Sequence, residues 1–237
     1  MLDYAWLIPF LPAVSFVAIL FFGKRMPKKG AEMGIAAVGA SFVLSCVTAV
    51  QWINRVEDAK HEVVKPVINN VTWWQNGLVK FDVGTQIDGL AVMMLFVVSL
   101  VALLVHIYST AYMKGDRRFT FYYAGLSLFT ASMLLLVVAS NTVELLVGWE
   151  LVGLCSFMLI GHWWEEGANS DAALKAFFTT RTGDIGLMIG IIITFFAAGT
   201  FSIVGINAYA LSRGADHTLM LVGASCLLLG IIGKSGQ

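Results

Sequence analysis

The sequence predicts an all-α polytopic membrane protein with about seven transmembrane helices. Of its 237 residues, 58% are hydrophobic and 13% are charged, and the mean hydropathy is +0.81. A water-soluble domain of this size does not normally show that balance. Apolar runs long enough to cross a hydrocarbon layer of about 30 Å recur along the chain between polar connections. We therefore expect a single membrane domain over residues 1–237, with two helices and an outer loop in residues 1–86 and the start of a larger helix bundle in residues 87–237.

The first two spans set the expected orientation. Residues 4–22 form the first apolar run and residues 31–53 the second. Asp3 precedes the first run, whereas a cleaved signal would carry positive charge there, so we expect an uncleaved span. Basic residues favour the inner side of a membrane, and the N-terminus is therefore expected outside. The basic residues that follow the first and third spans agree with this orientation: Lys24, Arg25, Lys28, Lys29, Lys114, Arg117 and Arg118.

A long polar connection, residues 54–86, separates the second span from the third. Its second half, VTWWQNGLVKFDVGT, mixes aromatic and β-branched residues around Asn76-Gly77. An Asn-Gly pair between such runs is a strong signal for a two-residue hairpin turn. We expect a small β-hairpin at about residues 71–86, on the outer surface.

Five further spans follow the hairpin. Residues 202–213 are too short to cross and too apolar for a free loop, so we expect a helix lying in the membrane interface there. The last span begins near Thr218 and is expected to break near Lys234, because Gly233 and Gly236 flank that lysine. Since the chain stops in an apolar helix, we expect it to be a fragment. The other expected spans are residues 87–112, 119–138, 142–164 and 172–198, with an inner loop at residues 165–171.

Several charged residues lie inside these spans. Glu150 is about 13 Å beyond Asn141 at 1.5 Å per residue, near the middle of the hydrocarbon layer. A charge at that depth costs about 2.5–3.5 kcal/mol, which indicates a role in moving ions or protons more often than a packing contact. In the next span, Asp184 follows Arg181 at i+3, and we expect the two to pair.

Three more side chains are candidates for the same path. A continuous last helix would carry Lys234 about 24 Å inward from Thr218. Lys175, one turn inside its span, could equally extend its ammonium to the inner surface. His106 could relay protons or simply pack, and for His162, beside Trp163 in an interfacial belt, packing is the preferred interpretation.

Other classes of site find little support. The three cysteines and four histidines share no metal-ligand or disulfide spacing. The Gly-Lys-Ser at 233 lacks the earlier glycine of a phosphate-binding loop, since residue 228 is leucine. The net charge of zero gives no indication of nucleic-acid binding.

Together these residues resemble the N-terminal part of the large antiporter-like membrane subunit of respiratory complex I, the L-type chain of NADH:quinone oxidoreductase. The resemblance rests on DGLAVMML at 88, LLVHIYSTAYMKGD at 103, GWELVGLCSFMLIG at 148, ALKAFFTTRTGDIG at 173 and GKSGQ at 233. It implies a proton-translocating subunit without a redox centre of its own, driven by quinone reduction elsewhere. FMN, iron–sulfur clusters and quinone are then expected in partner subunits, and the other membrane-arm subunits, lipids and protons are the expected partners.

The resemblance also assigns residues. It implies that Glu150 of the GWE motif pairs with Lys234 of the GKS motif, and it places further proton-translocating positions at Arg181, Asp184, Lys175 and His106. Glu144 departs from the family pattern and is expected to be a solvated residue at the mouth of the path. The implied location is a bacterial plasma membrane, with the mitochondrial inner membrane as the less favoured choice.

Three alternatives stay open on the sequence. The large subunit of a multi-subunit cation/proton antiporter resembles the same motifs. A seven-helix retinal protein would use Lys234 as its Schiff base. A structural spacer subunit is the third.

Overall fold

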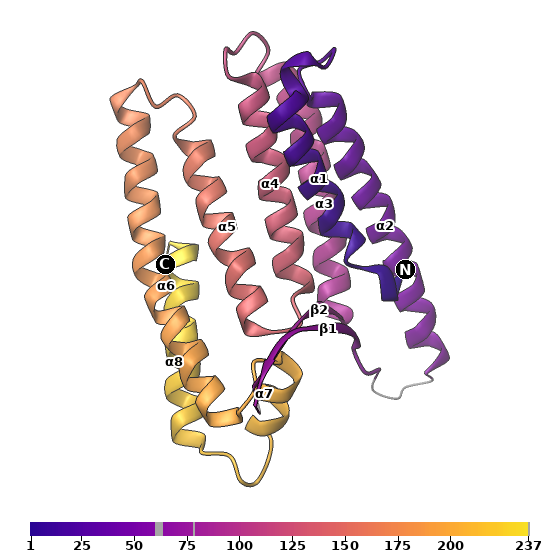
Figure 1. Cartoon of the computed structure of the whole chain (residues 1–237), viewed down its shortest axis with the longest axis vertical. Helices are drawn as coiled ribbons and strands as arrows, with labels where there is room; N and C mark the ends of the chain where they lie inside the picture. The colour runs from indigo at the N-terminus through magenta and orange to yellow at the C-terminus, as the bar shows by residue number, and fades with distance from the viewer. Residues whose placement is uncertain (60–63, 78, 237) are drawn as a thin grey trace. The chain divides into compact units, whose positions relative to one another are not determined.

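The computed structural model describes residues 1–59, 64–77 and 79–236. Within these ranges seven helices are long and apolar enough to cross a membrane, which confirms the predicted fold class (Figure 1). The seven are α1 (Leu7–Phe22, extended at both ends by the short 3-10 turns Leu2–Tyr4 and Gly23–Arg25), α2 (Ala31–Asp58), α3 (Gly89–Tyr112), α4 (Phe119–Val138), α5 (Thr142–Ile160), α6 (Gly167–Ala198) and α8 (His217–Ser235).

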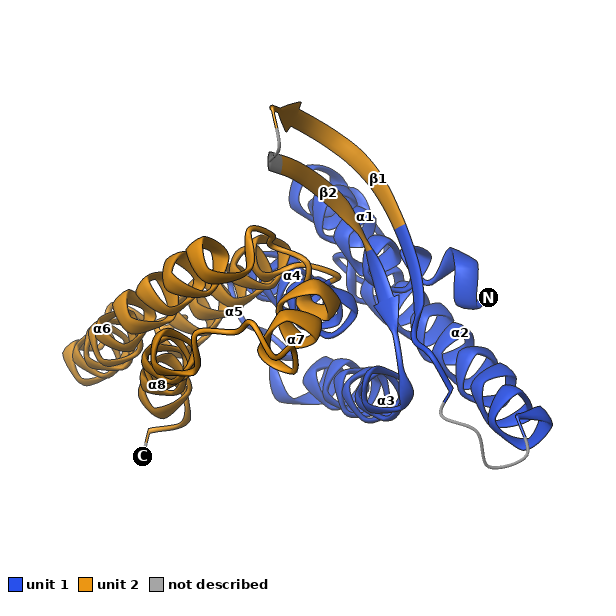
Figure 2. Cartoon of the chain, turned by 90° about the horizontal axis from the view of Figure 1, so that it is seen from below, with its two compact units in different colours: residues 1–69, 85–139 blue, residues 70–84, 140–237 orange. Residues whose placement is uncertain are grey.

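The helices belong to two compact units, coloured separately in Figure 2. Unit 1 comprises residues 1–69 and 85–139, and unit 2 comprises residues 70–84 and 140–237. Unit 1 contains α1 to α4, and unit 2 contains α5 to α8. The expectation of a single membrane domain over the whole chain stays a prediction.

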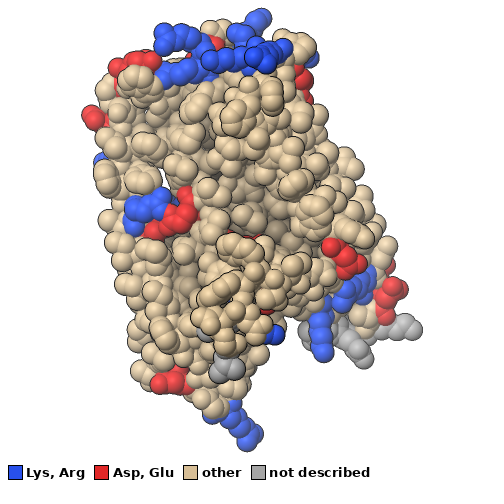
Figure 3. All heavy atoms as spheres, in the orientation of Figure 1, with Lys and Arg blue, Asp and Glu red and all other residues tan. Residues whose placement is uncertain are grey.

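The two basic connections of unit 1 lie side by side. The Thr120 hydroxyl, at the start of α4, donates a hydrogen bond of 3.1 Å to the carbonyl of Lys29, between α1 and α2. Figure 3 shows Lys and Arg side chains gathered at one end of the visible face. This is the arrangement that the predicted orientation requires, because both connections must face the same side of the membrane.

The predicted hairpin is present, with slightly different bounds. β1 (Val67–Asn76) and β2 (Val79–Ile87) pair in a two-stranded sheet, so the first strand begins four residues before the expected 71. Gly77 has φ +58°, the left-handed backbone that favours glycine in this turn. Asn76, the other expected turn residue, is the last residue of β1, and Leu78 lies outside the described residues. The Thr72 hydroxyl donates to Asp82 across the strands at 2.7 Å.

Helix ends in unit 2 differ from the expected spans. α5 ends at Ile160 rather than at 164. α6 begins at Gly167 rather than at 172, because the backbone amides of Asn169 and Ser170 donate to the carbonyl of Glu166 and start the helix inside the expected inner loop. The short helix α7 (Ile203–Ala210) lies within the predicted interfacial segment.

The break expected near Lys234 lies after that residue, at Gly236, and not at Gly233. α8 continues through Gly233 and Lys234, and left-handed backbone is reached only at Gly236, with φ +68°. The physical role of Gly233 is close helix packing. A Cβ on Gly233 would lie 2.8 Å from the Cα of Gly183 on α6, so the two backbones touch where neither residue has a side chain.

Glycines continue this contact along both helices. A Cβ on Gly186 would meet Leu229, one on Gly190 would meet Leu227, and one on Gly230 would meet Leu187. The residue numbers of the contact positions decrease along α8 as those on α6 increase, so the two helices are antiparallel. The last turn of α8, with Lys234, therefore meets the middle of α6.

Gly183→Ala is expected to destabilise unit 2 by about 1–3 kcal/mol, because its Cβ would lie 2.9 Å from the Gly233 Cα. To relieve this contact, the backbones of α6 and α8 would have to move apart. The denaturation midpoint of the purified protein in detergent measures the effect. Gly167→Ala, on the same helix with nothing within 4 Å of its Cβ, is the matched control. Equal midpoints for the two variants would contradict the packing argument.

Candidate functional site

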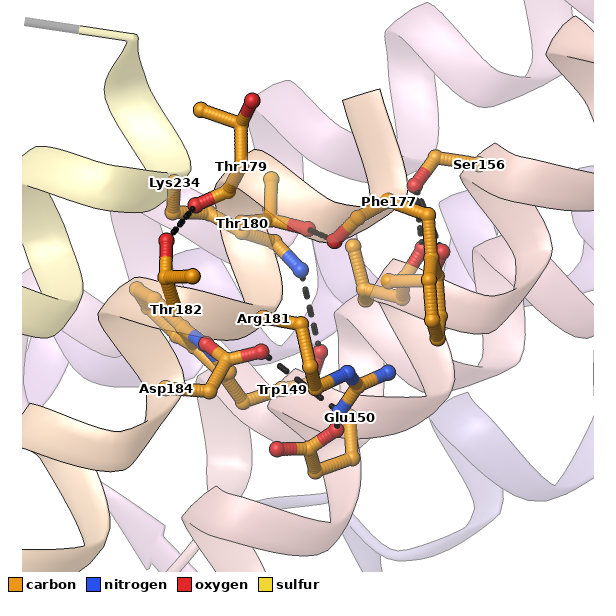
Figure 4. A network of polar contacts seen from close by, with 12 residues as sticks. Trp149, Glu150, Ser156, Phe177, Thr179, Thr180, Arg181, Thr182, Asp184 and Lys234 are labelled. Atoms are coloured by element: carbon orange, nitrogen blue, oxygen red, sulfur yellow. Dashed lines mark hydrogen bonds and ion pairs between the residues drawn. The ribbon is translucent and has the colours of Figure 1, made fainter. Parts of the chain in front are cut away.

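Five residues of unit 2 form one polar cluster between helices (Figure 4). Trp149 and Glu150 lie midway along α5, and Arg181 and Asp184 lie midway along α6. Lys234 comes from the last turn of α8. The cluster thus collects four charged side chains, three of them far from the ends of the helices that carry them.

Arg181 is the centre of the cluster. Its guanidinium forms an ion pair with Glu150 of α5 and a second one, at 3.5 Å, with Asp184 of its own helix. The Arg181–Asp184 pair confirms the i+3 prediction. The Arg181 and Glu150 side chains are 33% and 28% exposed, whereas that of Asp184 is 2% exposed. The guanidinium carbon also lies 4.7 Å from the centre of the Phe177 ring, a cation–π contact.

Trp149 belongs to the cluster, although it was not among the predicted site residues. Its indole Nε1 donates a hydrogen bond of 2.6 Å to Oδ1 of Asp184. Asp184 is thus held by two donors, the indole and the Arg181 guanidinium. A signal was available in the sequence, because a buried indole N–H usually needs an acceptor and Trp149 stands in the same deep part of its span as the acid of the GWE motif.

Lys234 approaches the cluster from the other side of Trp149. Its Nζ donates to the backbone carbonyl of Trp149 at 3.2 Å and lies 5.3 Å from the centre of the indole ring. A Cβ at Gly153 would come within 3.1 Å of this ammonium. A glycine at 153, one turn after Trp149, therefore leaves room for the lysine to reach α5.

The implied pairing of Glu150 with Lys234 is not what the structure shows. In the described residues Lys234 forms no ion pair, and Glu150 is paired with Arg181 instead. The reason is geometric. The Arg181 guanidinium is paired with the Glu150 carboxylate, and the Lys234 ammonium donates to the neutral carbonyl of Trp149.

Two other predicted residues do not join the cluster. Lys175 is exposed on α6, and only its backbone carbonyl takes part in a described side-chain hydrogen bond, from Thr179. His106 is fully buried in unit 1, on α3. His162, for which packing was preferred, is buried and packs edge-on against Trp163.

Glu144 is not the solvated mouth residue that was expected. It is half-buried, and its Oε2 accepts from the backbone amides of Gly84 and Ser140 at 3.4 and 3.2 Å and from the Asn141 side chain at 3.3 Å. The carboxylate therefore ties the start of α5 to the end of the hairpin. Among the described residues, no group of three or more His, Cys, Asp or Glu side chains is placed to hold a metal ion.

Trp149→Phe is expected to destabilise unit 2 while Lys234 keeps an aromatic face and a carbonyl. Loss of the indole donor leaves the buried Asp184 with one charged partner, at a cost of about 1–3 kcal/mol. The denaturation midpoint of the purified protein in detergent measures the effect. In an Asp184→Ala background, which removes the acceptor of the indole hydrogen bond, the same change should add little, because the two residues act as one pair. Additive losses would show that Trp149 acts independently of Asp184.

Two family descriptions match parts of this chain. Residues 139–237 match the family described as NADH:quinone oxidoreductase/Mrp antiporter, TM, and residues 73–123 match the NADH-ubiquinone oxidoreductase (complex I) chain 5 N-terminus. The first match contains all five residues of the cluster.

Individual relatives match nearly the whole chain. It is 39% identical over 236 residues to NADH-quinone oxidoreductase subunit L of Mycobacterium tuberculosis, covering 99% of this chain and 36% of the relative. It is 42% identical over 191 residues to F(420)H(2) dehydrogenase subunit L of Methanosarcina mazei, covering 81% of this chain and 27% of the relative. The chain thus spans about a third of the length of these relatives.

The fold recurs in a solved complex. One chain of the membrane-bound sulfane sulfur reductase, an archaeal respiratory membrane complex, superposes with a TM-score of 0.80 at 15% identity, over 97% of this chain and 44% of that one. This likeness supports the fold alone. The family matches and the relatives show that the chain belongs to the antiporter-like membrane-subunit family that includes subunit L of NADH:quinone oxidoreductase.

Proposed function

We propose that this chain translocates protons as a membrane-arm subunit of a quinone-reducing respiratory complex. The observation that carries the proposal is the charge pattern of the cluster: one guanidinium serves two carboxylates while a separate ammonium is held at a neutral carbonyl. Charged groups at membrane depth are costly, and those that are found there commonly mark a path for ions or protons.

This charge pattern can couple proton binding to side-chain movement. The single positive charge of Arg181 neutralises one of the two negative charges of Glu150 and Asp184. These three side chains therefore keep one net negative charge, which attracts one more positive charge. That charge is either a proton on a carboxylate or the ammonium of Lys234 moved closer. Two unit charges about 10 Å apart at an effective dielectric near 20 interact by about 1.7 kcal/mol, which changes an equilibrium more than tenfold. Moving the Lys234 ammonium toward or away from the carboxylates therefore makes a carboxylate release or bind a proton.

Redox chemistry belongs to the partner subunits in this proposal. The relatives are named as subunits of quinone- or F(420)H(2)-linked dehydrogenases. We propose that FMN, iron–sulfur clusters and quinone bind in other subunits, that this chain binds none of them, and that lipids surround its exposed apolar helices. The proposed location is a bacterial plasma membrane, with the N-terminus outside.

Purification of the full-length protein from its native membrane tests this assignment. A complex that carries flavin and iron–sulfur absorbance together with this chain, and that pumps protons when it reduces quinone, is the expected result. A retinal chromophore bleached by hydroxylamine, or a subunit that leaves pumping unchanged when its charged cluster is removed, would contradict it.

The second candidate is the large subunit of a multi-subunit cation/proton antiporter. The family description that matches residues 139–237 names the Mrp antiporter beside the oxidoreductase. In this case the purified complex would lack flavin and iron–sulfur absorbance and would exchange cations for protons without any electron donor.

A further inference from the structure

Unit 1 contains an apolar groove between α3 and α4. The groove has a volume of about 270 Å³, and its lining residues all belong to these two helices, within residues 97–105 and 126–133. Thr130 is the polar residue among them, and its hydroxyl donates to the carbonyl of Leu126 at 3.0 Å. The lining therefore presents hydrocarbon and a polar group that is already satisfied. This surface favours an occupant that is itself apolar.

The groove is open, and it continues toward one end of unit 1. Val97, Val101 and Val105 line it from α3 and are exposed. Tyr108 and Tyr112 follow at helical spacing on the same face of α3. Both tyrosines are exposed, and their rings stack with centres 5.5 Å apart. An exposed apolar strip therefore runs from the groove to the end of α3 at Tyr112.

This strip leads to the two basic connections of unit 1, which lie side by side. The acidic residues of the same region are engaged, because Glu32 and Asp116 accept hydrogen bonds from backbone amides at 3.1 and 2.6 Å. Six basic side chains are exposed there and take part in no ion pair within the described residues: Lys24, Arg25, Lys28, Lys29, Lys114 and Arg117. The end of the groove is thus a positively charged surface.

The distance between groove and charges matches one leaflet of a bilayer. At 1.5 Å per residue, the groove lies about 10–22 Å from Tyr112 along α3. Half of the hydrocarbon layer together with one headgroup region is about 20 Å thick. A phospholipid whose phosphate lies at the basic connections therefore places the second half of its acyl chain in the groove. An apolar helix of another subunit would fill the groove and leave the basic side chains without a partner.

We propose that unit 1 binds one anionic phospholipid, with an acyl chain in the groove between α3 and α4 and the phosphate at the basic connections. The general preference of basic residues for the inner side of a membrane accounts for the charges alone. It does not account for a groove that leads to them. The lipid site is independent of the proposed proton translocation.

Photo-cross-linking tests the site in the full-length protein within its assembled complex. The complex is reconstituted in phosphatidylcholine vesicles that contain a small fraction of phosphatidylglycerol with a diazirine near the end of one acyl chain. Cross-links are expected at residues 97–105 and 126–133. They should be about tenfold more frequent than with a phosphatidylcholine that carries the same diazirine chain, because basic residues attract anionic headgroups. Equal yields from the two lipids, or cross-links spread evenly over the exposed helix faces, would overturn the proposal.

Filling the groove should remove the cross-links. Val101→Trp places an indole in the groove and is expected to lower their yield about tenfold. Leu104→Trp is the matched control, because Leu104 is exposed on α3 and does not line the groove. A yield in Val101→Trp equal to that of the control would show that the chain binds elsewhere.

Neutralising the basic end should have the same effect through the headgroup. The double variant Lys114→Gln, Arg117→Gln is expected to lower the yield about tenfold, since each basic residue near an anionic headgroup adds to the attraction. Lys65→Gln, an exposed lysine between α2 and β1, is the control. Both altered side chains are exposed, so this variant gives a result even if Val101→Trp fails to fold. An unchanged yield would overturn the role of the basic connections.

Discussion

Lys234→Ala is expected to lower proton translocation by the full-length protein about tenfold or more, while the complex still assembles. Lys234 contacts a backbone carbonyl and an indole face and forms no ion pair in the described residues. Its removal therefore strands no buried charge, so folding should be little affected. The same removal deletes the only cation of the cluster that is not already paired with a carboxylate, and the proposed charge exchange depends on it.

Glu150→Gln should produce the same phenotype from the other partner, because the amide keeps the size of the side chain but cannot hold a negative charge. Proton uptake and quinone reduction are measured together in reconstituted vesicles. Ser235→Ala, an exposed neighbour of Lys234, is the matched control and should pump normally. Pumping at the control rate by both Lys234→Ala and Glu150→Gln would exclude the cluster from the proton path.

Arg181→Ala is expected to have the largest effect on stability. It leaves Glu150 and Asp184 without their shared guanidinium, and the Asp184 side chain is only 2% exposed. Breaking a buried pair from one side costs about 3–5 kcal/mol. The lower end of that range, about 3 kcal/mol, is the better expectation because the Arg181 side chain is 33% exposed and partly screened by solvent.

The amount of assembled complex and its denaturation midpoint measure this loss. Thr182→Ala is the control at the next position of α6, where the exposed hydroxyl donates to the Thr179 carbonyl. Arg181→Lys should recover part of the stability, since it restores the charge without the planar fork of donors. A midpoint for Arg181→Ala equal to that of Thr182→Ala would show that the two carboxylates find other partners.

Much of the fold could be predicted because membrane spans are local features of the sequence. Each apolar run was expected to form a helix, because only helices and closed barrels satisfy their backbone in lipid and runs of about 20 residues have the length of a spanning helix. The Asn76-Gly77 pair marked the hairpin. The positions of the helix ends in unit 2 differed from the predicted ones by four or five residues. Gly233 was interpreted as a break, although a glycine inside a helix can equally mark close packing, and the sequence of α8 alone cannot separate the two.

The sequence by itself determined which charges lie deep in a span, and it determined the Arg181–Asp184 pair, because residues three apart on one helix always share a face. Only the tertiary structure decided that Arg181 also forms an ion pair with Glu150. It likewise decided that Trp149 donates to Asp184 and that Lys234 donates to the Trp149 carbonyl. Each of these contacts joins two different helices. Their geometry depends on how closely the helices approach, which for α6 and α8 is set by the bare backbones of Gly183 and Gly233.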